Sequence, residues 1–110
     1  MNVSPIPVEL LPDDMTVWPP DPTAPYEGEY LDPLVIRRVR VESAEALSPT
    51  YYKLADGAKG RAFIDAVNSG GAFGPETGSK VEVRGRDYTV LSCIEFRPFG
   101  AVHHWEVDLG

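Results

Sequence analysis

The chain has 110 residues, a formal net charge of −7 and a single cysteine, Cys93. This length fits one domain with one hydrophobic core, and the lone cysteine has no partner for a disulfide within the chain. No apolar run approaches the roughly 20 residues of a membrane span, and the acidic balance argues against a nucleic-acid reader, which needs a basic surface.

Residues 1–33 are expected to form an extended arm. They contain seven acidic residues, no lysine or arginine, and eight of the eleven prolines. Proline removes a backbone donor and fixes φ, so we expect no central strand and no continuous helix here, only one short strand at 15–18. Removal of residues 1–20 is accordingly expected to leave the rest of the fold intact.

The arm nevertheless contains too many apolar side chains for an inert tail. We therefore expect it to dock, either on its own barrel domain, described below, or on a neighbouring subunit. The candidate contact residues are Ile6, Val8, Leu10, Leu11, Trp18, Tyr26 and Tyr30.

The segment LVIRRVRVE at 34–42 predicts a strand with an irregularity in its middle. It is rich in β-branched residues, but its apolar positions change parity, from 34 and 36 to 39 and 41. Either a bulge near Arg37 and Arg38 or burial on both faces explains this switch.

Residues 43–60 are compatible with two structures. They form either a short helix with Ser43 as its N-cap or a long excursion that ends among the glycines before position 61, and Pro49 argues against one long helix. In residues 61–67 the alternate positions Ala62, Ile64 and Ala66 share one face, which predicts a further strand.

The sequence NSGGAFGPETGS at 68–79 is rich in glycine. It is either a flexible hairpin tip or a loop that projects into a channel or a neighbouring protein, with Phe73 as a contact. It superficially resembles a phosphate-binding loop, but three residues instead of four separate the glycines, and Ser79 precedes Lys80. No nucleotide site is therefore expected.

The last 33 residues predict three consecutive strands. Residues 80–84 alternate valine with charged residues, and Gly85 supplies the positive-φ residue of a tight hairpin turn. Leu91 and Cys93 make one face of the returning strand partly apolar, so that face is expected to be covered, as in a barrel. The other face of this strand is expected to carry Tyr88, Val90, Ile94 and Phe96.

The final strand, at 101–109, has an apolar face that includes two candidate core or interface residues, His103 and Trp105. His103 and His104 are adjacent, so they point to opposite faces and are not expected to chelate one metal ion. No nucleophile stands beside an evident base. We expect no catalytic residue, no cofactor and no enzymatic activity.

Together these elements predict an all-β fold. A small antiparallel β-barrel or sandwich at 34–110 follows the proline-rich arm at 1–33, with at most one short helix.

Four blocks in this order resemble the minor capsid proteins encoded beside the head genes of long-tailed phages of Gram-positive bacteria. They are PIPVELL at 5–11, FIDAVNS at 63–69, GSKV followed by DYTV at 78–90, and HHWEVDL at 103–109. The sequence departs from the family pattern at 43–61 and in the glycine-rich loop. At the level of the fold, that family resembles the head-closure, or stopper, proteins beneath the portal ring.

The resemblance implies a structural protein of the virion neck, made in the host cytoplasm. Its implied partners are further copies of itself in a ring, the portal or adaptor, and the tail-side neck proteins. It would enclose DNA without sequence-specific binding and would not contact a membrane. A stopper, an adaptor and a tail terminator are not distinguished by the sequence, and the alternative outside the virion is a cytoplasmic β-barrel adaptor module.

Overall fold

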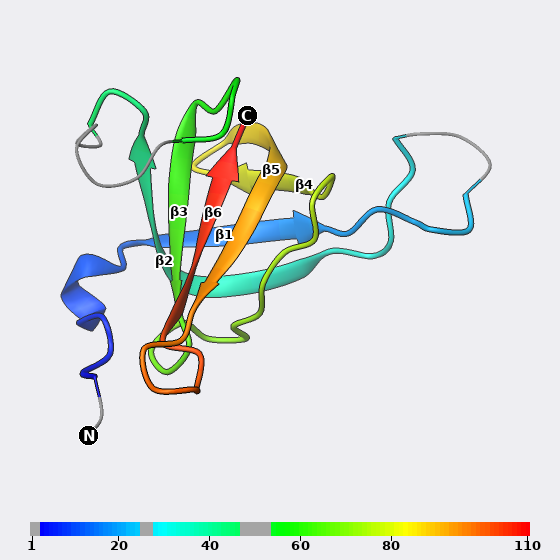
Figure 1. The fold of residues 1–110 in the computed structure, drawn as a ribbon. Helices are drawn as coiled ribbons and strands as arrows, with labels where there is room; N and C mark the ends of the chain where they lie inside the picture. Colours follow the sequence, from blue (N-terminus) through cyan, green and yellow to red (C-terminus); the bar gives the residue numbers. More distant parts are fainter. Residues whose placement is uncertain (1–2, 25–27, 47–53) are drawn as a thin grey trace.

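The computed structural model describes residues 3–24, 28–46 and 54–110 (Figure 1). Six antiparallel strands close into a barrel in the order β1-β2-β3-β6-β5-β4, which confirms the all-β prediction and selects the barrel. A single 3-10 turn, η1, precedes the barrel in the described residues. The elements are η1 (Val8–Leu10), β1 (Asp13–Trp18), β2 (Leu34–Ser43), β3 (Gly60–Asp65), β4 (Lys80–Val83), β5 (Arg86–Phe96) and β6 (His104–Leu109).

Every strand contributes to the core inside the barrel. Successive side chains of a strand point to opposite faces, so alternate residues fill the interior and the intervening ones face outward. The core consists of Met15, Val17, Ile36, Val39, Val41, Ala62, Ile64, Val81, Val83, Val90, Val107 and Leu109. The β-branched residues that dominate this list suit a pleated, buried surface.

Strand β1 confirms the predicted short strand but is more central than expected. It pairs with β2 on one side and β4 on the other, and Met15 and Val17 are fully buried. The expectation that residues 1–33 hold no central strand is therefore wrong for 13–18. Pro12 and Pro19 flank this stretch, and no proline within it interrupts the ladder.

The predicted bulge in β2 is confirmed. Met15 pairs with Ile36 and Asp13 pairs with Val39, so β2 carries one extra residue, and Arg38 has a φ of 58°. The bulge turns both Ile36 and Val39 toward the core.

A second bulge, in β5, makes the prediction for that strand wrong beyond Val90. Val90 pairs with Leu109 and Cys93 pairs with Val107, so β5 also carries one extra residue. Residues opposite each other in a ladder share a face, so Cys93 turns toward the core. Ile94 lies outside opposite Glu106, with 52% of its surface exposed.

The glycine-rich loop is not a hairpin tip, because β3 and β4 do not pair with each other. The loop returns along the barrel: Gly70 forms a backbone bridge with Arg37 of β2, and Phe73 packs against the core. A Cβ atom added to Gly74 would lie 2.7 Å from the Trp105 ring. This close approach explains why glycine occupies the position.

Residues 19–24 and 28–33 continue the β1–β2 pair beyond the barrel, and we call them the hairpin extension. The Asp21 amide donates to the Glu29 carbonyl at 3.0 Å, and the Leu31 amide donates to the Pro19 carbonyl at 2.8 Å. The extension reaches away from the barrel on the right of Figure 1, and the molecule measures 47 × 28 × 26 Å.

Much of the region for which a helix or a loop was predicted, 43–60, lies outside the described residues. In its described part, the Ala46 amide donates to the Ser43 hydroxyl at 3.3 Å. Within the part of the chain that the structure describes, no helix is long and apolar enough to cross a membrane.

Candidate functional site

The start of the arm is docked on its own barrel. The Ile6 amide donates to Asp65 Oδ1 at 2.8 Å, and Asn68 Nδ2 donates to the Ile6 carbonyl at 2.8 Å. His103 Nε2 lies 2.7 Å from the Ser4 carbonyl. We call Asp65, Asn68 and His103 the arm clasp. All three hold backbone atoms of the arm, so the clasp does not depend on the arm's side chains.

Asp65 is the centre of the clasp. It ends β3, is completely buried, and accepts hydrogen bonds from the amides of Ile6, Val67 and Asn68. Because a buried carboxylate is costly without partners, these three donors explain how the position tolerates a charge. The Ser69 hydroxyl accepts from the Asp65 amide at 2.9 Å and donates to the Arg38 carbonyl, which ties the turn to the bulge of β2.

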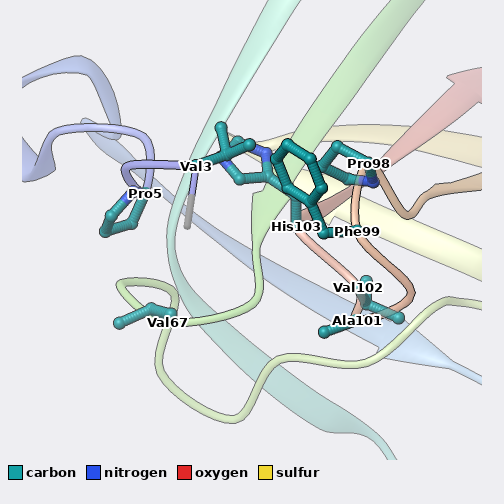
Figure 2. Close-up of a pocket in the computed structure, with 8 residues that line it drawn as sticks. All are labelled: Val3, Pro5, Val67, Pro98, Phe99, Ala101, Val102 and His103. Carbon is teal, nitrogen blue, oxygen red and sulfur yellow. The ribbon is translucent and has the colours of Figure 1, made fainter. Parts of the chain in front are cut away.

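The docked arm completes an apolar pocket of about 380 Å³. Its walls are Val3 and Pro5 of the arm, Val67 of the turn after β3, and the β5–β6 loop from Pro98 to His103. Figure 2 shows Val3, His103, Phe99 and Pro98 gathered on one side, with Val67 and Ala101 on the other. Val67 and Phe99 are 73% and 62% exposed, so the pocket opens to solvent.

A buried ionic cluster lies on the outer face of β3 and β6. The Arg61 guanidinium donates to both carboxylate oxygens of Asp108, at 2.6 and 3.2 Å, and to Glu106 at 3.2 Å. All three side chains are less than a tenth exposed. The hydrogen bonding of Arg61 to Asp108 raises the pKa of the guanidinium above its ordinary value. The Ala55 amide also donates to Asp108 at 2.8 Å, so the chain after β2 covers the cluster.

Two histidines connect the arm to this cluster. His103 Nδ1 and His104 Nδ1 are 2.7 Å apart, and His104 Nε2 is 2.9 Å from Glu106 Oε2. The His104 ring stacks on Phe96 with 4.7 Å between ring centroids. A continuous polar chain therefore runs from Ser4 through both histidines to Glu106 and Arg61.

The candidate contact residues of the arm are in different environments. Val8 and Leu10 in η1 and Tyr30 in the hairpin extension are exposed, whereas Leu11 is buried, with 2% of its surface exposed. Ile6 is partly buried between its backbone contacts. Trp18 is partly buried and lies under the Lys80 ammonium, which is 5.0 Å from the ring centroid. Tyr26 lies outside the described residues.

The remaining candidates, Phe73, Trp105 and His103, are all partly buried. Phe73 and Trp105 pack against the core, and His103 belongs to the clasp. The sequence interpretation missed Asp65, Asn68 and Arg61. Their only sequence signal was the FIDAVNS block and a charged position at the start of a strand.

The Cys93 thiol is half-buried near Gly74 and Trp105. Burial, and secondarily the charge of Glu95, raises the pKa of the thiol from 9.0 to about 11. Since the thiolate is the nucleophile, we expect iodoacetamide at pH 8 to alkylate Cys93 roughly a hundredfold more slowly than an ordinary cysteine. Mass spectrometry of native and denatured protein measures both rates, and equal rates would contradict the prediction.

The described residues contain no group of three or more His, Cys, Asp or Glu side chains placed to hold a metal ion. Every buried side-chain nitrogen and oxygen in this part of the chain has a hydrogen-bond partner. What the geometry offers is a set of contact surfaces: the arm, the pocket beside it and the hairpin extension.

Residues 7–109 match the model of a protein family described as minor capsid protein. No curated protein and no solved structure matches the sequence. The family match begins in the docked arm and includes all six strands of the barrel.

Proposed function

The chain belongs to the minor capsid protein family, and from this premise we propose that it is a head-closure or head–tail connector protein in the neck of a tailed phage. Proteins of this family are structural components of the virion. In the neck, a ring of this protein would extend the portal channel, help to retain the packaged DNA and provide a surface for the tail. The family match over residues 7–109 carries the proposal.

The closed barrel limits how such a ring can be built. Because closure leaves no unpaired strand edge, neighbouring subunits would not meet by extending a common sheet. Ring contacts join two different faces of the subunit. The elements that stand out from the barrel, η1 with Val8 and Leu10 and the hairpin extension with Tyr30, are the proposed contacts.

The charge of the hairpin extension suits a wall beside DNA. Its described residues include Asp21, Glu29 and Asp32 and no lysine or arginine. Hydrogen bonds from Thr23 hold the pKa of Asp21 below its ordinary value, so this carboxylate stays charged at neutral pH. Such a surface repels phosphate groups and would let a packaged genome pass without adhering.

Light scattering on a size-exclusion column tests the proposal. The mass is measured for the purified protein alone and with the products of the neighbouring head and tail genes. A protein that forms a ring, or joins one when the portal or adaptor is added, supports a neck position. If the protein stays monomeric and binds none of these proteins, under conditions in which the portal remains assembled, the result would favour an adaptor module outside the virion.

Paired variants test the proposed contacts in the same assay. Val8→Ser with Leu10→Ser removes two apolar groups that are 48% and 49% exposed, and we expect association to weaken about tenfold or more. Ile94→Ser is the matched control, since this side chain is 52% exposed on the barrel wall. Equal effects of both changes would argue against η1 as the contact.

A further inference from the structure

The two histidines that link the arm to the ionic cluster need a particular number of protons. The Ser4 carbonyl can only accept a hydrogen bond, so His103 Nε2, at 2.7 Å, must carry a proton. Glu106 accepts from Arg61, and its second oxygen is 2.9 Å from His104 Nε2, which must also carry a proton. The hydrogen bond of 2.7 Å between the two Nδ1 atoms requires one proton and one lone pair.

The four ring nitrogens therefore hold three protons. Two neutral imidazoles hold only two, so the pair carries one positive charge, shared across the Nδ1–Nδ1 hydrogen bond. The charge resides on either ring without any change in the outer contacts.

The surroundings favour this charge. Arg61 supplies one positive charge to the cluster, while Glu106 and Asp108 supply two negative ones, so the singly charged pair makes the five groups neutral together. Asp65 of β3 lies opposite His104 in the ladder and adds a further buried carboxylate. Phe96 of β5 lies opposite His104 in the ladder, and its charged neighbours in the sequence, Glu95 and Arg97, form an exposed ion pair with each other at 2.8 Å.

From this proton count we propose that His103 and His104 form a latch that strengthens the hold of Asp65 and Asn68 on the N-terminal arm, and that acts fully only while the pair carries a single positive charge. Loss of the shared proton leaves His103 with one proton for two acceptors, Ser4 and His104, so one of these contacts is lost. Gain of a fourth proton places two N–H groups against each other at the Nδ1–Nδ1 contact, which separates the rings. The arm is thus held less firmly on both sides of a window of pH, while the contacts of Asp65 and Asn68 with Ile6 remain.

Release of the arm changes the surface next to the latch. Val3 and Pro5 of the arm line the apolar pocket together with His103, and Val3 lies beside His103 (Figure 2). When the arm leaves, the β5–β6 loop and Val67 lose that cover, and the arm becomes available to another surface. The latch goes beyond the proposed neck function and does not depend on it.

Nitrogen NMR of the whole protein tests the proton count. The chain has two histidines, so every imidazole signal belongs to the pair. With ¹⁵N-labelled histidine we expect a range of pH in which both Nε2 atoms are protonated and the two Nδ1 atoms share one proton, and we expect the protection of the arm to be greatest in that range. Two neutral rings with the arm docked at full protection would overturn the proposal.

Hydrogen exchange at the Ile6 amide tests the release of the arm. We expect the protection factor, corrected for intrinsic exchange, to peak where the pair is singly charged and to fall on the order of fivefold on either side. His103→Phe keeps a ring beside the pocket, and it should lower the protection and remove its pH dependence. Ser4→Ala is the control, because the latch uses the Ser4 backbone carbonyl, and it should behave like the parent protein.

A His103→Phe variant with unchanged, pH-dependent protection would overturn the latch. The latch would also be overturned if, in the parent protein, the protection factor of the Ile6 amide did not change as the histidines titrate. The proton count from NMR and the pH dependence of Ile6 exchange are both measured on the parent protein, so they test the latch even if a variant fails to fold.

Discussion

Replacement of Arg61 by methionine is expected to lower the free energy of unfolding by about 3–5 kcal/mol. Arg61 donates to Asp108 and Glu106, and all three side chains are buried on the outer wall of the barrel. Without the guanidinium, two carboxylates remain in a poorly solvated site with no positive charge between them. Urea denaturation followed by circular dichroism measures the loss.

The pH dependence of this effect follows from the pKa of Arg61. The hydrogen bonds that Arg61 donates to Asp108 raise that pKa above its ordinary value, so the folded state binds the proton more tightly than the unfolded state does. Such a contribution is fully present at every pH below the unfolded value and is lost only above it. The Arg61 proton should therefore add no pH dependence to the difference between the parent protein and Arg61→Met from neutral pH to about pH 10.

Two further variants distinguish the effect of the buried ionic cluster from that of an exposed ion pair. Arg97→Met removes an exposed partner of Glu95, 2.8 Å away, and should lower the free energy of unfolding far less than Arg61→Met does. A triple variant combines Arg61→Met with Glu106→Gln and Asp108→Asn. It removes the negative charges of both carboxylates but keeps an acceptor oxygen at each position. It should recover most of the free energy of unfolding that Arg61→Met alone loses. If Arg61→Met and Arg97→Met lowered the free energy of unfolding equally, the loss in Arg61→Met could not come from leaving two buried carboxylates without a positive partner.

The two bulges show what alternation along a strand can reveal. In β2 the extra residue was visible in the sequence, because the apolar positions change parity while the intervening residues are arginines. In β5 the extra residue was not visible in the sequence. Leu91 and Cys93 make both faces of the strand apolar, so the pattern is equally compatible with a regular strand and with a bulged one. A bulge is detectable from sequence only where the two faces differ in polarity.

The candidate site was predictable only in part. His103 and Ile6 were identified from their apolar or aromatic setting, and the structure brings both to the arm clasp. Their partners were not identified, because Asp65 lies 59 residues from Ile6 in the sequence and Asn68 lies 62 residues from it. No local pattern encodes a contact across such a distance.

Deletion of residues 1–20 is expected to abolish cooperative folding, contrary to the expectation from the proline content alone. The deletion removes β1, which opens the barrel and leaves β2 and β4 with unpaired edges. It also removes Met15 and Val17, whose burial contributes about 1.5–3 kcal/mol each. A domain of this size is stable by only about 5–15 kcal/mol, so loss of a strand and two core residues exceeds what it tolerates.

Deletion of residues 1–10 is the matched comparison and should leave the barrel folded. It keeps the buried Leu11 and all of β1. It removes η1, the contacts of Ser4 and Ile6, and the part of the pocket lining that Val3 and Pro5 supply. We expect a loss of about 1–3 kcal/mol from the missing hydrogen bonds. Amide spectra and thermal unfolding distinguish the two deletions, and a folded barrel in the longer deletion would show that β1 is dispensable.

The same comparison determines what an assembly experiment can mean. In the longer deletion, failure to assemble follows from the loss of the barrel and says nothing about the arm. In the shorter deletion the barrel remains, so any loss of association with the portal or with further copies belongs to residues 1–10. Normal association of that variant would remove the arm from the mechanism and leave the hairpin extension as the proposed contact between subunits.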